Sequence, residues 1–278
     1  EWHWNSMAEY LSAIDAVNPA TNSMMLVPHG AIRAMALGWE NRPASHDDLE
    51  KMKAILAQAM EEGAVGFSTG LIYPPGMYAD YKELIELCKV AASYGGFFVV
   101  HMRNEGDYLE ESIQEVTDIC LKAECPLHIS HLKASGQPNW GKSKKALALI
   151  EKAREQGLEV TFDQYPYIAG STMLDAVIPP RFHTGGTKQL LESLKDPAIR
   201  EEIRLVQENV KPERWENWVA ACGWDNIMIN AVVSDKNRFA EGKTIAELSQ
   251  ELNKTPLDVV ADLIIEEKDA VTMTIFYG

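Results

Sequence analysis

The feature of this 278-residue sequence that most constrains its fold is a repeated alternation of short apolar runs with helical segments. The runs end at Thr69, His101, His131 and Asp163, at intervals of 32, 30 and 32 residues, and an earlier run ends near His29. Strands that alternate with capped helices of this length indicate βαβ units and a parallel sheet. The sequence therefore predicts an α/β fold.

Helix signals occupy the intervals between the runs. Ser45 and Asp80 are N-capping residues that stand three positions before an acidic side chain, and Gly63 and Gly95 stand where the same two helices should end. Helices are therefore predicted over residues 46–62, 81–94, 107–123 and 144–156.

Two architectures share this spacing, the (β/α)8 barrel and the doubly wound sheet. Barrel enzymes take their active-site residues from the carboxyl ends of several strands, whereas an open sheet binds ligands in one crevice. Polar residues follow all five runs, namely His29, Ser68 and Thr69, His101 and Arg103, His131 and Lys133, and Asp163 and Tyr165. This distribution favours part of a (β/α)8 TIM-type barrel.

The alternation stops after Ser171, and three segments are expected. Residues 1–177 would form the central βα units of the barrel. Residues 178–225, which contain several prolines and a cluster of tryptophans, would form an inserted, helical, lid-like subdomain. Residues 226–278 would return to the barrel and stop before its last strand, so we expect the chain to be an internal fragment.

Composition narrows the possible partners. The 26 basic and 41 acidic residues give a formal net charge of −15, which argues against nucleic acid or an anionic membrane as partner. The apolar runs are too short to cross a bilayer. The four cysteines form no CxxC pair, and we expect reduced thiols in a cytoplasmic protein that acts on a small molecule.

Two histidines at adjacent strand ends carry the chemical prediction. Strand alternation places His131 with Lys133, and His101 with Arg103, on faces that would point into the barrel, whereas His128 would point towards the helices. At equal heights on strands about 4.8 Å apart, two imidazoles could reach one zinc ion through bonds of about 2.0–2.1 Å. The alternative is two separately hydrogen-bonded core histidines.

The histidine pair alone does not complete a zinc site. Tetrahedral zinc needs a third protein ligand, yet the sequence contains no HxH motif, and spacing alone reveals no well-placed Cys or Glu. His29 could line the barrel mouth or belong to the core. The remaining histidines, His3, His46 and His183, are expected at the surface.

Several short motifs together resemble one enzyme family. They are Gly66–Gly70 (GFSTG), Leu71–Pro75 (LIYPP), His101–Glu105 (HMRNE), Ile129–Lys133 (ISHLK), Asp163–Tyr167 (DQYPY) and Ala169–Thr172 (AGST). In order and spacing they resemble the N-acyl-D-amino-acid deacylases, or D-aminoacylases, of the metal-dependent amidohydrolase superfamily. The resemblance implies a distorted (β/α)8 barrel that uses zinc to hydrolyse the amide bond of an N-acyl-D-amino acid.

The resemblance also implies roles for individual residues. His101 and His131 match metal-binding positions, and the residues that match substrate-binding positions are Tyr73, Lys133, Tyr165 and Ser171. Lys133 would pair with the substrate carboxylate, and Tyr165 would donate a hydrogen bond to the carbonyl oxygen as charge develops on it. Arg103 would serve either the substrate or the structure.

Some family features have no counterpart in this sequence. These are the HxH of the first strand, the bridging metal ligand of the second and the catalytic Asp of the eighth; Asp235 does not fit the last role. The chain would thus supply strands three to seven, and by itself it should be inactive. Two alternatives stay open: a dihydroorotase- or hydantoinase-like cyclic amidase, and a metal-free barrel with Lys133 as a Schiff-base amine or a non-catalytic binding module.

Overall fold

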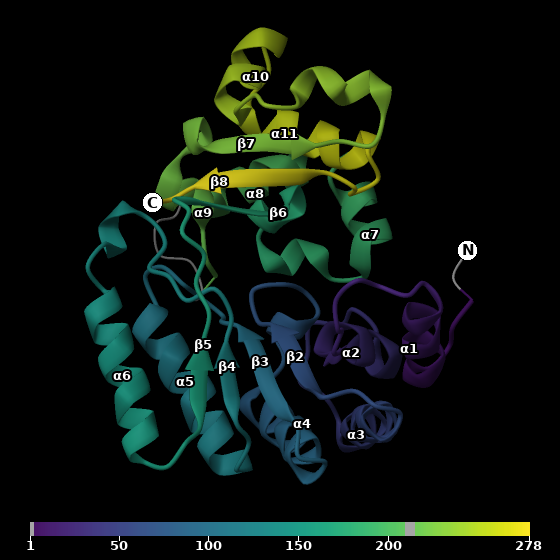
Figure 1. Cartoon of the computed structure of the whole chain (residues 1–278). Coiled ribbons are helices and arrows are strands. Elements are labelled where there is room, and N and C mark those ends of the chain that lie inside the picture. Colours follow the sequence, from purple (N-terminus) through teal and green to yellow (C-terminus); the bar gives the residue numbers. More distant parts are fainter. Residues whose placement is uncertain (1–2, 209–214) are drawn as a thin grey trace. The chain divides into compact units, whose positions relative to one another are not determined.

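The computed structural model of the chain describes residues 3–208 and 215–278 (Figure 1). The elements group into two compact units. The first consists, in its described part, of residues 3–103, Leu109–Leu132 and Lys144–Gln164, and the second consists of Asn104–Tyr108, Lys133–Ser143 and the described residues of Tyr165–Gly278.

A five-stranded parallel sheet forms the centre of the first unit. Its strands lie side by side in chain order: β1 (Leu26–Pro28), β2 (Gly66–Gly70), β3 (Phe97–His101), β4 (Leu127–Ile129) and β5 (Val160–Phe162). The helices that precede, connect or follow them are α1 (Met7–Ala16), α2 (His29–Leu37), α3 (His46–Glu61), α4 (Tyr81–Ser93), α5 (Leu109–Ala123) and α6 (Ser143–Glu155), with a 3-10 turn at Gly76–Tyr78. The predicted parallel sheet is confirmed.

The helix ends follow from the capping residues that the sequence contains. The Ser45 hydroxyl accepts a hydrogen bond from the Asp48 backbone N–H (3.2 Å), and the Asp48 carboxylate accepts one from the Ser45 N–H (3.0 Å), which completes a capping box. Asp80 caps α4 by accepting from the Glu83 N–H at 2.8 Å. These contacts fix where α3 and α4 begin.

The two faces of the sheet have different environments. Phe67, Phe98 and Ile129 are fully buried on the face that α3, α4 and α5 cover. On the opposite face Val99 is only partly buried, and in the strand register it lies beside His128. The prediction that His128 points towards the helices is therefore wrong.

The error in the face of His128 has a backbone cause. The predicted alternation runs through His131, but β4 ends at Ile129, and His131 has a left-handed backbone with φ of 42°. A left-handed residue interrupts the two-residue period of a strand. The face on which His128 lies therefore cannot be inferred from the direction of the His131 or Lys133 side chain.

The second unit contains an antiparallel sheet in the order β6 (Ala169–Met173), β8 (Thr272–Phe276), β7 (Ile227–Ala231). Ile227, Ile229, Met273 and Ile275 are buried on one of its faces. The helices are α7 (Gly186–Ser193), α8 (Pro197–Glu208), α9 (Trp218–Cys222), α10 (Ile245–Leu252) and α11 (Pro256–Glu266), with 3-10 turns at Gln137–Asn139, Leu174–Val177, Pro180–His183, Trp224–Asn226 and Asp235–Ala240.

Residues 226–278 supply two strands of this sheet, because β7 and β8 pair antiparallel in the order β6, β8, β7. The return of this segment to a barrel stays a prediction. The alternation of Thr272 and Thr274 with buried Met273 and Ile275 is typical of an antiparallel sheet with one open face. The chain passes into the second unit for the last time at Tyr165. The predicted division at residues 178 and 226, and the lid role of residues 178–225, stay predictions.

Within residues 3–208 and 215–278, none of the helices combines the length and the apolar character that crossing a bilayer requires.

Candidate metal centre

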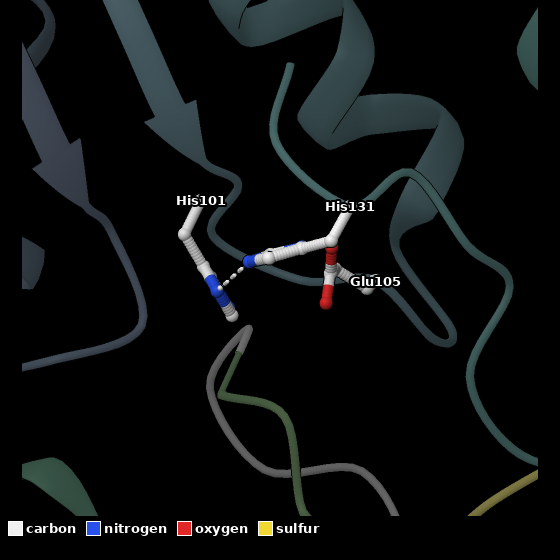
Figure 2. Close-up of side chains that lie close together, drawn as sticks. All are labelled: His101, Glu105 and His131. Atoms are coloured by element: carbon white, nitrogen blue, oxygen red, sulfur yellow. Dashed lines mark hydrogen bonds between the residues drawn. The ribbon is translucent and has the colours of Figure 1, made fainter. Parts of the chain in front are cut away.

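Two imidazole rings meet beyond the carboxyl ends of β3 and β4. His101 is the last residue of β3, and His131 follows β4 by two residues. Nδ1 of His101 lies 3.0 Å from Nε2 of His131, with the ring centroids 4.6 Å apart and the ring planes at 75° (Figure 2). Both residues are partly buried. The structure thus brings together the two histidines that the sequence singled out.

The rings meet for a reason other than equal height on adjacent strands. The last registered pair of β3 and β4 is Val100 with Ile129, so His131 lies one residue beyond the position opposite His101. After Ser130 donates its backbone N–H to Val100 O at 3.0 Å, the left-handed turn at His131 redirects the side chain. The turn, rather than the register, directs the ring towards His101.

A carboxylate at the end of the next strand contacts this turn. Asp163 Oδ1 accepts the His131 backbone N–H at 2.5 Å, and Oδ2 lies 2.9 Å from Nε2 of His128. Nδ1 of His128 in turn lies 2.7 Å from the Thr161 hydroxyl. Partial burial alone would raise the pKa of Asp163, but the hydrogen bonds from His128 and from the His131 N–H bring that pKa below its usual value.

In the described part of the chain, one group of three metal-ligating side chains emerges: His101, Glu105 and His131 (Figure 2). Sequence spacing identified no suitable Glu, so Glu105 is an addition to the prediction. Its signal was the position four residues after His101, on the loop that leaves β3. Within the second unit Glu105 pairs with Lys133, whose Nζ lies 2.5 Å from Oε2.

The donor set suits zinc. Two imidazole nitrogens and a carboxylate oxygen are the ligand types of many three-ligand zinc sites, whereas calcium and magnesium favour oxygen. The 3.0 Å between the ring nitrogens is close to the roughly 3.3 Å that separates two ligands on a tetrahedral zinc with bonds of about 2.0–2.1 Å. A small increase in the distance between the two ring nitrogens would therefore allow both to bind the ion.

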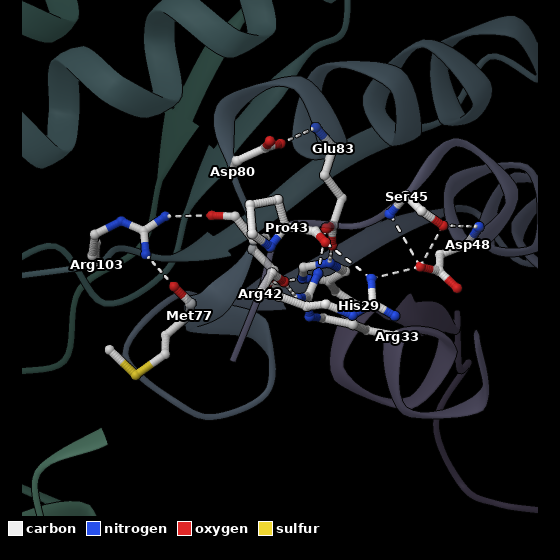
Figure 3. Close-up of polar contacts among 12 residues, drawn as sticks. His29, Arg33, Arg42, Pro43, Ser45, Asp48, Met77, Asp80, Glu83 and Arg103 are labelled. Atoms are coloured by element: carbon white, nitrogen blue, oxygen red, sulfur yellow. Dashed lines mark hydrogen bonds and ion pairs between the residues drawn. The ribbon is translucent and has the colours of Figure 1, made fainter. Parts of the chain in front are cut away.

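The loop after β2 contributes an aromatic side chain beside the pair. The ring of Tyr73 lies 5.3 Å from the ring of His101. Arg103 anchors this loop, because its guanidinium donates to Met77 O at 2.7 Å (Figure 3). The same guanidinium is held by both Glu115 oxygens, at 2.9–3.1 Å. The open question about Arg103 is thereby answered in favour of a structural role.

The other predicted substrate residues lie in the second unit. Lys133 Nζ lies 5.4 Å from the ring centroid of Tyr165, and the Tyr165 hydroxyl is hydrogen-bonded to the Tyr277 hydroxyl. The exposed Ser171 donates its hydroxyl to Met273 O at 3.0 Å, across the β6–β8 pair. Their roles towards a substrate stay predictions.

A second carboxylate supports the loop that contains Glu105. Oε2 of the buried Glu216 accepts the Glu105 backbone N–H at 3.0 Å. Burial, aided by the nearby Glu105 charge, raises the pKa of Glu216 to about 7. The sequence offered no signal for Glu216, because its isolated position in a loop is typical of a surface residue.

Two other histidines are buried, one in each unit. His29 is in α2, fully buried, with Nδ1 2.8 Å from the Thr69 hydroxyl and Nε2 2.7 Å from Glu83, which also pairs with Arg33 (Figure 3). Burial lowers the pKa of His29 despite Glu83. His183, which we expected at the surface, is buried with Nε2 3.2 Å from Ile178 O, so that prediction is wrong.

Comparison with known proteins gives the fold and site a context. The chain is 38% identical over 173 residues to a D-aminoacylase of Alcaligenes xylosoxydans xylosoxydans, with 62% of this chain and 36% of that protein matched. It is 42% identical over 175 residues to an N-acyl-D-glutamate deacylase of the same organism, with 63% and 35% matched. No protein-family model matches the chain.

Solved structures agree with these relatives. A D-aminoacylase crystal structure, described as defining a subset of amidohydrolases, matches with a TM-score of 0.73 and 29% identity, over 98% of this chain and 47% of that one. The N-acyl-D-glutamate deacylase of Bordetella bronchiseptica, complexed with zinc and a phosphonate inhibitor, matches with a TM-score of 0.74 and 28% identity over the same shares.

The chain is thus similar, in sequence and in fold, to amidohydrolases. Within that class its relatives are the N-acyl-D-amino-acid deacylases, as the sequence motifs predicted. The chain spans about a third of the length of the curated relatives it matches.

Proposed function

We propose that this chain is part of a zinc-dependent enzyme that hydrolyses N-acyl-D-amino acids to a D-amino acid and a carboxylate. The observation that carries the proposal is the 3.0 Å approach of His101 and His131, at positions that match the family's metal-binding histidines. The names of the relatives, D-aminoacylase and N-acyl-D-glutamate deacylase, supply the substrate class.

The parallel sheet is proposed to be strands three to seven of a (β/α)8 barrel. Its strands keep chain order across the sheet, whereas a doubly wound sheet reverses order at its switch point. In the described part of the chain, α3, α4 and α5 pack on the strands, and the buried side chains of that face lie opposite Val99 and His128. In a (β/α)8 barrel the helices cover only the outer face of the sheet, because the inner face is enclosed by the strands themselves. A doubly wound sheet has helices on both faces. The arrangement observed here therefore supports the barrel.

His101 and His131 would hold the zinc, with Glu105 as a candidate further ligand. When bound, zinc polarises an amide carbonyl and favours ionisation of a bound water. The histidines' part is to present ring nitrogens at a fixed separation, which Tyr73 supports by packing on His101. Because Glu105 is already paired with Lys133, its loss should weaken zinc binding less than loss of either histidine.

The remaining site residues would bind the substrate. Lys133 would pair with the α-carboxylate, which requires its ammonium to exchange Glu105 for the substrate. Tyr165 would donate its hydroxyl to the developing oxyanion, in exchange for Tyr277. Tyr73 and Ser171 would line the site, and residues 178–225 would form its lid.

The general base is proposed to lie outside this chain. Asp235 is not a candidate, because its carboxylate is 91% exposed and pairs with Arg238 at 3.0 Å. The chain alone should therefore lack deacylase activity. We propose a cytoplasmic protein whose partner is a small molecule.

Hydrolysis assays on the full-length protein test the proposal. An N-acetyl-D-amino acid, dihydroorotate and hydantoin should be compared at equal concentration with zinc-loaded protein. Faster release of a free D-amino acid supports the deacylase, and preferential opening of a cyclic substrate supports a cyclic amidase instead. Trapping of a carbonyl compound on Lys133 by borohydride, with no zinc bound, would overturn the hydrolase proposal.

A further inference from the structure

The backbone of His131 adopts a conformation that a bulky side chain seldom takes unaided. Its φ of 42° is in the left-handed region, where the Cβ of any residue other than glycine crowds the following carbonyl. Without this conformation the side chain would continue the alternation of β4 and would not meet His101. Something in the structure must therefore stabilise the turn.

Asp163 contacts the turn at three points. Its carboxylate Oδ1 accepts the His131 N–H at 2.5 Å, its carbonyl accepts the Leu132 N–H at 2.9 Å, and its own N–H donates to Ile129 O at 3.2 Å. The two backbone bonds continue the pairing of β4 with β5. The hydrogen bond to the Asp163 carboxylate is different in kind. The left-handed turn takes the His131 N–H out of the backbone pairing of β4 with β5, and the carboxylate accepts this N–H instead.

The orientation of the Asp163 carboxylate is fixed in turn. Its Oδ2 lies 2.9 Å from Nε2 of His128, and Nδ1 of His128 lies 2.7 Å from the Thr161 hydroxyl. A neutral imidazole that donates from Nε2 and accepts at Nδ1 satisfies both contacts. This chain of bonds leaves Oδ1 directed at the His131 N–H.

We infer that Asp163 is a positioning residue of the metal site: by accepting the His131 N–H it fixes the left-handed turn that aims the His131 imidazole at His101, and His128 orients Asp163 for this task. The inference rests on the proposed zinc-binding function of the two histidines. It assigns a role to residues that do not themselves touch the metal.

An ordinary ion pair between His128 and Asp163 would predict something different. The Asp163 side chain is 60% exposed, and exposed pairs contribute little to stability. Replacement of such a pair should leave metal binding unchanged. A positioning role instead predicts a loss of zinc affinity in a protein whose stability hardly changes.

The test compares variants of the full-length protein. Zinc affinity is measured by competition with a chromophoric chelator, and the site geometry is read from the visible absorption of the Co²⁺-loaded protein. Asp163→Ala should bind zinc about 10- to 100-fold more weakly, the range typical of residues that orient metal ligands, and should show an altered Co²⁺ spectrum. Asp163→Asn keeps an oxygen acceptor for the His131 N–H, so it should stay within about threefold of the wild type.

Asp235→Ala is the matched control, because it removes an exposed carboxylate remote in sequence from the histidines and should bind zinc like the wild type. Wild-type affinity and an unchanged Co²⁺ spectrum in Asp163→Ala would overturn the inference. If Asp163→Ala does not fold, His128→Leu decides, since zinc binding about three- to tenfold weaker supports the inference and wild-type binding overturns it. Wild-type zinc affinity in His101→Ala would instead overturn the proposed function itself.

Discussion

The first unit contains the same arrangement of side chains twice, in two different environments. His29 and His128 each approach a threonine hydroxyl through Nδ1, at 2.8 and 2.7 Å, and a carboxylate through Nε2, at 2.7 and 2.9 Å. The carboxylate of the first arrangement is Glu83, whose side chain is 1% exposed, and that of the second is Asp163, whose side chain is 60% exposed.

The second oxygen of each carboxylate explains the difference in role. Glu83 uses it to pair with the fully buried Arg33, so the network around His29 is closed on itself within the core. Asp163 uses it to bind the backbone of His131. The same set of side-chain contacts therefore has two roles. Around the buried His29 it stabilises the core, and around His128, where the carboxylate is exposed, it positions His131.

Replacement of Glu83 by Ala should have the largest effect. It leaves the buried Arg33 guanidinium and His29 without their carboxylate, and removal of one partner of a buried pair costs about 3–5 kcal/mol in the free energy of unfolding. Urea denaturation of the full-length protein measures the effect. Glu86→Ala, which removes a 28% exposed carboxylate from the same helix, should cost under about 1 kcal/mol. Equal losses for the two variants would contradict the contrast.

Replacement of His131 by Ala should affect the metal and spare the fold. Loss of a ligand should weaken zinc binding by at least about 100-fold, the upper range for residues that only orient ligands. Because His131 is partly exposed, the free energy of unfolding of the metal-free protein should change by about 1 kcal/mol or less. The exposed His46→Ala is the control for the competition assay, and a zinc affinity equal to that control would exclude His131 as a ligand.

Replacement of Arg103 by Gln should show an intermediate effect. It removes the contacts to Glu115 and to Met77 O that hold the loop after β2, at a cost of about 1–2 kcal/mol. Since this loop contains Tyr73, KM for the N-acyl-D-amino acid should rise more than kcat falls. The side chain of Arg238 is 66% exposed, so Arg238→Gln should change neither the free energy of unfolding nor KM. An Arg103 variant that behaved like Arg238→Gln would refute the anchoring role.

The pH dependence of stability should show the smallest effect. Because burial lowers the pKa of His29 in the folded protein, the unfolded state binds more protons below about pH 6.5, and stability falls as pH decreases through that range. One such group contributes at most about 1.4 kcal/mol per pH unit. His29→Gln should flatten the stability profile between about pH 5 and 6.5, and an unchanged slope would count against this account.

Local patterns in the sequence predicted the parallel strands of the first unit and four of its helices, α3 to α6. Strand ends at His101 and near His131, together with the caps Ser45 and Asp80, follow local rules of alternation and hydrogen bonding that the structure obeys. The sheet of the second unit was harder to predict, because the sequence of a strand does not show which other strand it pairs with. Only the Thr–Met–Thr alternation of β8 distinguished it from a barrel strand.

The site was predictable in part. Two histidines at adjacent strand ends gave the pair, but the left-handed turn at His131 could not be foreseen, since only a few per cent of non-glycine residues adopt a positive φ. Glu83 and Arg33 lie on helices among apolar residues, and charged residues in such positions usually reach solvent. Each of the two charged side chains can be buried only because the other one pairs with it. Such a contact between two helices cannot be read from the sequence of either helix.

The proposed function requires that His101 and His131 bind one zinc ion. A crystal structure of the zinc-loaded full-length protein, with anomalous scattering measured on both sides of the zinc edge, tests it directly. Zinc bound by both histidines should give one strong anomalous peak about 2.0–2.1 Å from a ring nitrogen of each. A zinc ion bound elsewhere, with the two rings still in contact with each other, would contradict it.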